Sequence, residues 1–264
     1  MTDEPAKHRV SGDATGEGTR SAGGEITIDA SPERVWRALT DARELERWFP
    51  LDARVESGEG GTVWMSWRNE FASDMKILMW EPPRHLRTAW SFHEGELPAQ
   101  VTDYTLESEG GKTVLRVVTS GFPLDPSWDG WVEGTNRGWA FELRSLKHYL
   151  ERHEGQPRHV AYLRRRVPLP AQVAWSRIED SGELASLLGA GEPFDRRPGG
   201  QYAAVMPTTD DLFRLSIEPG APGVELNEVV VFLSAWGNHA ARIEATGSDL
   251  AARLDRLFPE GTTP

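Results

Sequence analysis

The strand-to-helix pattern at residues 25–49 constrains the fold more than any other stretch of this chain. Residues 25–29 alternate polar and apolar side chains, which predicts a half-buried strand. Ser31 and Pro32 follow, and they suit the N-cap and the first turn of a helix. Apolar residues then recur at helical spacing, namely Val35, Trp36 and Leu39. The stretch therefore predicts a strand that leads directly into a short amphipathic helix.

The same pattern recurs 139 residues further along the chain. At this shift the matched pairs are Val167 with Ile28, Pro170 with Ser31, Trp175 with Trp36, Ile178 with Leu39, Asp180 with Asp41, Glu183 with Glu44, Leu184 with Leu45 and Leu188 with Phe49. The order of the elements expected after each copy also agrees. The sequence therefore predicts a disordered tail over residues 1–23, a first domain over 24–154 and a shorter second copy over 158–264.

Composition and charge limit the class of protein. With 264 residues, 38% of them hydrophobic and 27% charged, the chain is large enough for two soluble globular domains. No apolar run approaches the roughly 20 residues of a membrane span, and residues 1–23 lack the apolar core of a signal peptide. The net charge of −12 disfavours a nucleic-acid partner, and the lack of cysteine excludes disulfides and thiolate sites. These features favour a cytoplasmic protein with no membrane span.

Short β-rich runs follow the first helix and predict an antiparallel meander, because the breaks between them are too short for parallel crossovers. The runs cover residues 62–67, 73–80, 85–92, 101–106 and 113–119. Their alternation places one set of side chains on a single covered face of the sheet. On that face we expect Val63, Met65, Trp67, Met75, Ile77, Met79, Leu86, Trp90, Phe92, Tyr104, Leu106, Leu115 and Val117.

The longest helical pattern spans residues 128–151, with Asp129 as a candidate cap. Its apolar stripe consists of Trp139, Leu143, Leu146 and Leu150. A long amphipathic helix after a curved antiparallel sheet buries such a stripe across the concave face of the sheet. The predicted fold class is therefore α+β, a helix-grip sheet wrapped around a long C-terminal helix, in two tandem copies. Ser248 is expected to cap the closing helix of the second copy.

Three separated motifs in the first domain resemble a known family. Residues 30–36 (ASPERVW) are similar to the opening of the START-like (SRPBCC) superfamily. The proline pair in residues 81–86 (EPPRHL), which leads to Trp90, resembles the activator-of-heat-shock-protein-90-ATPase-like family within it. Residues 120–151 are similar to that family's closing helix. The resemblance covers residues 24–153, and over 158–264 it rests on the repeat alone.

The resemblance implies three functions, taken in order of preference. Members of the superfamily enclose an apolar cavity between the sheet and the final helix, and some bind lipids, polyketides or other hydrophobic molecules. The first hypothesis is therefore a module that binds a hydrophobic small molecule. The second is a co-chaperone-like interaction module, with a chaperone as its partner. The third is an enzyme that resembles START-like cyclases or hydrolases.

The expected cavity has a Trp-rich lining that would bind a flat or hydrophobic molecule by removing apolar area from water. Ten residues are the candidates for ligand contact: Trp67, Met75, Ile77, Trp90, Phe92, Tyr104, Trp131, Trp139, Glu142 and Leu143. The competing interpretation is that these side chains simply fill the core. The sequence alone does not decide between the two, because it does not report a volume.

Catalysis would require titratable groups in or near that cavity. The candidates are Asp103, Tyr104 and Glu142, with Arg68 and Glu70 near the mouth. Asp103 has the parity opposite to Tyr104, so both cannot point inward from a regular strand. A solvated or hydrogen-bonded side chain is the competing interpretation for each, and we assign no catalytic residue.

The histidines offer no clear ligand set for a metal ion. His148 and His153 are five residues apart, a poor fit to the i, i+4 spacing that places two imidazoles on one face of an α-helix. No cysteine or nearby aspartate completes a set. The sequence therefore predicts neither a metal site nor a cofactor.

Overall fold

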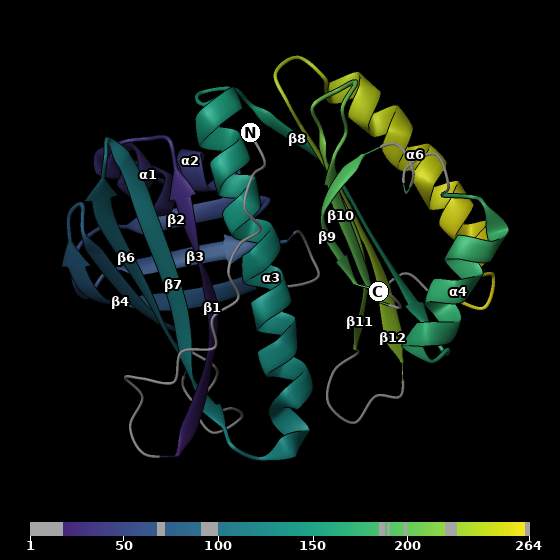
Figure 1. Cartoon of the computed structure of the whole chain (residues 1–264), viewed down its shortest axis with the longest axis horizontal. Coiled ribbons are helices and arrows are strands. Elements are labelled where there is room, and N and C mark those ends of the chain that lie inside the picture. The colour runs from purple at the N-terminus through teal and green to yellow at the C-terminus, as the bar shows by residue number, and fades with distance from the viewer. Residues whose placement is uncertain are drawn as a thin grey trace. The chain divides into compact units, whose positions relative to one another are not determined.

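The computed structural model describes residues 18–67, 72–90, 100–184, 188, 191–197, 200–219 and 226–261. The chain divides into two compact units, residues 1–155 and 156–264. Each unit has its own antiparallel sheet, with seven strands in the first and five in the second (Figure 1). In the described part of the chain, no helix is long and apolar enough to cross a membrane.

The sheet of the first unit is a meander closed by the first strand. Its strands are β1 Thr19–Ile28, β2 Asp52–Glu56, β3 Thr62–Ser66, β4 Ala72–Glu81, β5 His85–Trp90, β6 Val101–Glu109 and β7 Lys112–Pro123. Their order is β1-β7-β6-β5-β4-β3-β2, and all neighbours are antiparallel. Every predicted run is therefore a strand, and β2 is a strand that the sequence analysis did not predict.

The predicted inner face is confirmed along most of the meander. Val63, Met65, Met75, Ile77, Leu86, Tyr104, Leu106, Leu115 and Val117 are all buried. Met79 is only half-buried, because the register shifts between Ile77 and Met79 and breaks the alternation there.

The helices of the first unit pack on this sheet. They are α1 Pro32–Thr40, α2 Ala42–Glu46 and α3 Asp129–His148, and a π-helical turn, Tyr149–His153, follows α3. Helix α3 lies along β1 (Figure 1), and its predicted stripe is buried. Ser31 is the N-cap residue of α1 as predicted, although its hydroxyl makes no capping bond. The prediction that Asp129 caps α3 is wrong, since Trp128 is the N-cap residue and the Asp129 carboxylate pairs with Arg20.

Strand β1 begins at Thr19, inside the stretch that was expected to be a disordered tail. A Gly- and Ser-rich composition resembles a linker, but here the glycines allow close packing. A Cβ on Gly23 would lie 2.0 Å from the Val117 carbonyl oxygen, so only glycine fits there. The Gly23 N–H also donates to Asn136 Oδ1 of α3 at 2.9 Å. Residues 19–23 therefore belong to the sheet.

The second unit has the same order of elements with four meander strands in place of six. Its elements are β8 Arg158–Val167, α4 Ala171–Ser181, β9 Glu192–Arg197, β10 Gln201–Val205, β11 Leu212–Pro219, β12 Asn227–Trp236 and α6 Ala240–Leu257. The strand order is β8-β12-β11-β10-β9. Strand β8 ends at Val167 and β1 at Ile28, the same 139-residue shift that the sequence shows. That this unit is a shortened second copy stays a prediction.

The closing helix of the second unit begins earlier than predicted. Helix α6 starts at Ala240, so Ser248 lies inside it and the prediction that Ser248 is its cap is wrong. The Ser248 hydroxyl donates to the Glu244 carbonyl at 3.0 Å, the back-bond that a serine within a helix commonly makes. Buried Ile243 extends the apolar stripe of Leu250 and Leu254 toward the N-terminus. This added contact holds the first two turns on the sheet.

Candidate ligand pocket

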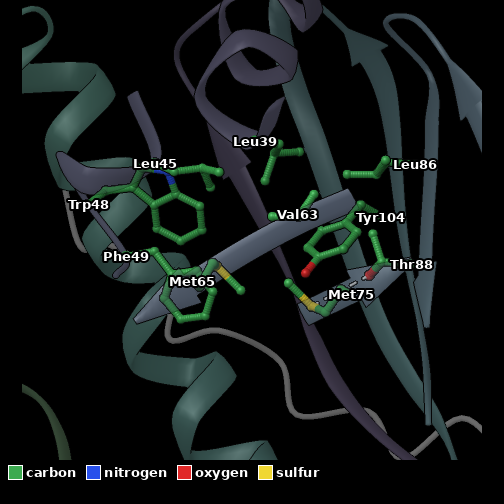
Figure 2. A pocket seen from close by; sticks show the side chains of 10 residues that line it. All are labelled: Leu39, Leu45, Trp48, Phe49, Val63, Met65, Met75, Leu86, Thr88 and Tyr104. Carbon is green, nitrogen blue, oxygen red and sulfur yellow. Dashed lines mark hydrogen bonds between the residues drawn. The ribbon is translucent and has the colours of Figure 1, made fainter. Parts of the chain in front are cut away.

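An apolar pocket lies in the first unit between the α1–α2 segment and strands β3 to β6. Figure 2 shows its lining, which consists of Leu39, Leu45, Trp48, Phe49, Val63, Met65, Met75, Leu86, Thr88 and Tyr104. The strands supply alternate residues of the covered face, as the pleat requires. The set includes no charged side chain, so the pocket suits an uncharged, mainly apolar molecule.

The segment after α2 is fixed by hydrogen bonds that orient Trp48 and Phe49. The Trp48 indole N–H donates to the Ala38 carbonyl at 2.8 Å, and the Ser145 hydroxyl of α3 donates to the Trp48 carbonyl at 2.7 Å. The Trp48 and Phe49 rings stack with centroids 5.1 Å apart. The Asp41 carboxylate caps α2 by accepting from the Glu44 N–H at 3.1 Å. One wall of the pocket is therefore held in place by hydrogen bonds to the backbone of α1 and to a side chain of α3, beside a capped α2.

Tyr104 places a hydroxyl group in this apolar pocket. Figure 2 shows its ring projecting into the space, with the oxygen toward Met75. Within the described residues, no hydrogen bond reaches this hydroxyl. Burial raises the pKa of Tyr104 well above its ordinary value, so the group stays protonated at neutral pH. The Thr88 hydroxyl, another polar group of the lining, contacts Met75 Sδ at 3.9 Å.

The pocket is nearly filled by its own side chains in this structure. Its volume is ≈ 20 Å³, slightly more than the roughly 10–15 Å³ that one water molecule needs on this measure. A larger molecule therefore requires side chains of the lining to move.

The structure places two of the ten predicted ligand residues in the lining, Met75 and Tyr104. Trp67 and Trp139 form a next layer, because both rings lie against Phe49 with centroid distances of 5.3 and 5.8 Å. Trp139 also lies edge-on to Tyr104 at 5.7 Å. The predicted cavity lay under α3, whereas the described lining contains no α3 residue, because the Trp139 indole fills that space.

The remaining six predicted residues lie elsewhere. Three are buried outside the lining: Ile77, Glu142 and Leu143. Trp90 is half-buried at the end of β5. Trp131 is 39% exposed near the start of α3, where its ring lies 5.8 Å from that of Trp128. Phe92 lies outside the described residues.

The sequence analysis did not select the residues that α1 and α2 contribute, which are Leu39, Leu45, Trp48 and Phe49. The signal was present, since all four belong to the apolar positions of the opening stretch. They were interpreted as core packing that defines the fold. A short helical segment that closes one end of a sheet both packs against the core and bounds a cavity, and periodicity does not separate these roles.

The titratable candidates do not gather at the pocket. Asp103 faces outward as its parity predicts, and its carboxylate accepts from Arg87 Nε and contacts His85 Nε2, each at 2.7 Å. Glu142 is buried in α3, outside the lining. Arg68 and Glu70 lie outside the described residues. Tyr104 is therefore the titratable residue that the lining contains.

His148 and His153 lie on one face despite their five-residue spacing, because the helix does not remain α-helical. The π-helical turn Tyr149–His153 follows His148, and in such a turn hydrogen bonds run from i to i+5. Residues five apart then lie on one face. The Nε2 atoms of His148 and His153 are 3.2 Å apart and the ring centroids 4.9 Å apart.

The first unit is thus a START-like domain of the helix-grip class, with an antiparallel sheet packed on a long closing helix and an apolar pocket between the sheet and the α1–α2 segment. Residues 29–151 match the family model described as Activator of Hsp90 ATPase homolog 1-like protein. This part of the chain belongs to that family. A search of the curated proteins found no match to the chain.

Several solved structures are similar to this chain. MLL2253 from Mesorhizobium loti is 27% identical over 51% of this chain and 99% of its own, with a TM-score of 0.46. The Aha1 dimer from Colwellia psychrerythraea is 25% identical over 51% of this chain and 98% of its own, with a TM-score of 0.44. DynU16, from the dynemicin biosynthetic locus, is 18% identical over 90% of this chain and 96% of its own, with a TM-score of 0.44.

Proposed function

We propose that the first unit binds a small, mainly apolar molecule with one hydrogen-bonding group in the pocket beside Tyr104. The observation that carries the proposal is the hydroxyl of Tyr104, a buried residue; the hydroxyl points into an apolar space and has no hydrogen-bond partner among the described residues. A fully buried polar group without a partner costs about 1–3 kcal/mol, and a hydroxyl that borders a small pocket bears part of this cost. A ligand with a carbonyl or hydroxyl group at this point would recover part of that cost.

The rest of the affinity would come from apolar burial. Each Å² of apolar surface removed from water contributes about 25 cal/mol, and the lining offers aliphatic, aromatic and thioether groups around the hydroxyl. A charged ligand is disfavoured, because the lining contains no charged side chain to compensate it.

Binding requires the pocket to widen, and two methionines make this possible. Met65 and Met75 are both 2% exposed and line the space beside Tyr104. Methionine has three rotatable bonds and a flexible thioether, so it adapts to different neighbours more easily than a branched side chain. We expect these two side chains to move first when a molecule larger than water enters.

Native mass spectrometry and a probe titration test this proposal. The purified chain is examined for a retained small molecule and then titrated with N-phenyl-1-naphthylamine while tryptophan emission is recorded. We expect saturable binding with quenching of the tryptophans near the pocket. Val63→Phe fills the pocket and should abolish binding, whereas the matched Val118→Phe, on the half-buried outer side of β7, should not. Absence of both a retained mass and saturable binding would contradict the proposal, as would equal binding by folded Val63→Phe.

The role of the hydroxyl is tested separately with Tyr104→Phe, which keeps the ring. For a ligand that bears a carbonyl or hydroxyl group, whether retained or found by screening, affinity should fall roughly 2- to 10-fold with the loss of one hydrogen bond. An unchanged affinity would mean that the ligand does not contact Tyr104. Purely apolar probes should bind the variant at least as well as the native chain.

A second candidate function, protein binding as in an activator of a chaperone ATPase, has its own supporting observation. Leu124 is 60% exposed and Trp131 39% exposed, and the Trp131 ring lies 5.8 Å from the tilted ring of Trp128 at the start of α3. Exposed aromatic and aliphatic groups are typical of protein-binding surfaces. If this function holds, Leu124→Ala with Trp131→Ala should abolish stimulation of an Hsp90-type ATPase, and Val63→Phe should leave it unchanged.

A further inference from the structure

The π-helical turn at the end of α3 creates a pair of imidazoles that α-helical geometry would separate. His148 is 6% exposed and His153 is half-buried. Their Nε2 atoms are 3.2 Å apart, and the ring planes are inclined at 54°. A π turn is less favourable than a continued α-helix and is often found at functional sites. The turn therefore has a specific consequence here, which is to bring two nitrogen ligands together.

The distance between these nitrogens matches the distance between two ligand atoms bound to the same metal ion. At metal–nitrogen distances of 2.0–2.1 Å, two imidazole nitrogens lie about 2.9 Å apart for a right angle at the metal and about 3.3 Å apart for a tetrahedral angle. The observed 3.2 Å falls between these values. The two rings can therefore share a metal ion in place of a proton with little movement.

We infer that His148 and His153 form a two-imidazole site for a divalent transition-metal ion, with Nε2 of each ring as a ligand. The site lies outside the proposed ligand pocket, because neither histidine belongs to its lining. It is thus independent of the proposed function.

The turn that follows His148 and ends at His153 is anchored on both sides. The Tyr149 hydroxyl donates to Glu44 Oε2 at 2.6 Å and accepts from the Gly155 N–H at 3.0 Å. Arg34 Nη2 donates to the Leu150 carbonyl at 3.0 Å and pairs with Glu154. These bonds tie the turn to α1 and α2. The backbone that carries the imidazoles is therefore held in place before a metal binds, which lowers the entropy cost of binding.

The donor atoms decide which ions the site prefers. Imidazole nitrogen suits Zn²⁺, Cu²⁺ and Ni²⁺, whereas Mg²⁺ and Ca²⁺ prefer oxygen. Within the first unit, the carboxylates on or beside the turn are already paired: Glu44 with Arg47, Glu151 with Lys147, and Glu154 with Arg34 and Arg37. For a given site of this kind Cu²⁺ binds more tightly than Ni²⁺ or Zn²⁺. The chain has no cysteine, so no thiolate competes for these ions.

Calorimetric titration of the full chain with Zn²⁺ and electron paramagnetic resonance with Cu²⁺ test the inference. We expect one saturable Zn²⁺ ion per chain and nitrogen hyperfine coupling from two imidazoles in the Cu²⁺ spectrum. His153→Gln should abolish the saturable Zn²⁺ binding and remove one nitrogen from the Cu²⁺ spectrum. The half-buried position of His153 makes this variant less disruptive than His148→Gln, and circular dichroism checks that both variants are folded.

His85→Gln is the matched control, because His85 also contacts a polar partner but lies on β5, in a different part of the unit. Its Zn²⁺ affinity should equal that of the native chain. The inference is overturned if folded His153→Gln binds Zn²⁺ as the native chain does, or if the native chain shows no saturable binding. In the second case the 3.2 Å contact is a hydrogen bond between two imidazoles and nothing more.

Discussion

At the scale of single residues, Gly23 shows how a backbone contact decides which side chain is allowed. A Cβ at this position would lie 2.0 Å from the Val117 carbonyl oxygen and 2.9 Å from its carbon. Both atoms belong to β7, so they cannot move without disturbing the sheet. We expect Gly23→Ala to lower the free energy of unfolding by about 1–3 kcal/mol or more, the usual cost of overpacking. Urea unfolding followed by circular dichroism measures this change.

Gly134→Ala is the control for this substitution. A Cβ on Gly134, in α3, would have no heavy atom within 4 Å. Alanine is the better helix former, so this variant should be more stable by about 0.5–1 kcal/mol. Equal stability of Gly23→Ala and the native chain would show that β1 does not pack against β7 as described.

The residues of the pocket differ in how far the sequence predicts them. Strand alternation is enough to place Met75 and Tyr104 on the covered face, because the strand period is two and the face is buried along its length. Alternation does not reveal which of those residues border empty space. Leu39 and Phe49 border it because of how the α1–α2 segment packs against the sheet, a matter of tertiary packing that no local pattern records.

At the scale of elements, α3 holds the first unit together through its buried stripe. Leu146 is 0% exposed and lies midway along that stripe. Leu146→Ala removes buried methyl groups and leaves a cavity, which should lower the free energy of unfolding by about 2–5 kcal/mol. Leu124→Ala, at a position 60% exposed, should change it by no more than about 0.5 kcal/mol. An equally small change in the free energy of unfolding for Leu146→Ala would show that the stripe is exposed to solvent.

The strands that the sequence analysis missed share a physical cause. Strands β2 and β9 lie at the edges of their sheets. An edge strand pairs on one side only, and charged residues or proline there prevent pairing with another chain. Strand β2 accordingly reads DARVE, and β9 contains Pro193 and three charged residues after Phe194. Strand β2 alternates over only two apolar residues, Ala53 and Val55, and β9 has only Phe194 besides its proline, so neither pattern is long enough to identify a strand.

The π turn was unpredictable for a different reason. A helical period read from the sequence assumes one geometry throughout the element, and the pattern from Trp139 to Leu150 gives no sign of a change. The extra residue per turn appears only when the backbone is placed, with Tyr149 and Glu154 tied to α2 and α1. The meaning of the five-residue histidine spacing depends entirely on that local change.

At the scale of the whole molecule, each unit has the parts of an independently folding domain. Every strand pair lies within one unit, and the core cluster of the second unit draws its members from residues 161–258. The boundary falls at Gly155 and Gln156, where Gly155 adopts a φ of 80° that favours glycine. Domains with a core of their own commonly fold when separated, provided that no strand or helix is cut.

We therefore expect residues 1–155 to fold alone, with cooperative thermal unfolding and the same affinity for N-phenyl-1-naphthylamine as the full chain. The reason is that the pocket and all the elements around it lie within these residues. A protein of residues 1–128 is the control, because it lacks α3, so the sheet loses the stripe that covers it and should not fold cooperatively. Proton NMR and differential scanning calorimetry distinguish the two. If residues 1–155 prove unfolded while the full chain is native, the stability of the first unit depends on the second, and the two units are one folding unit.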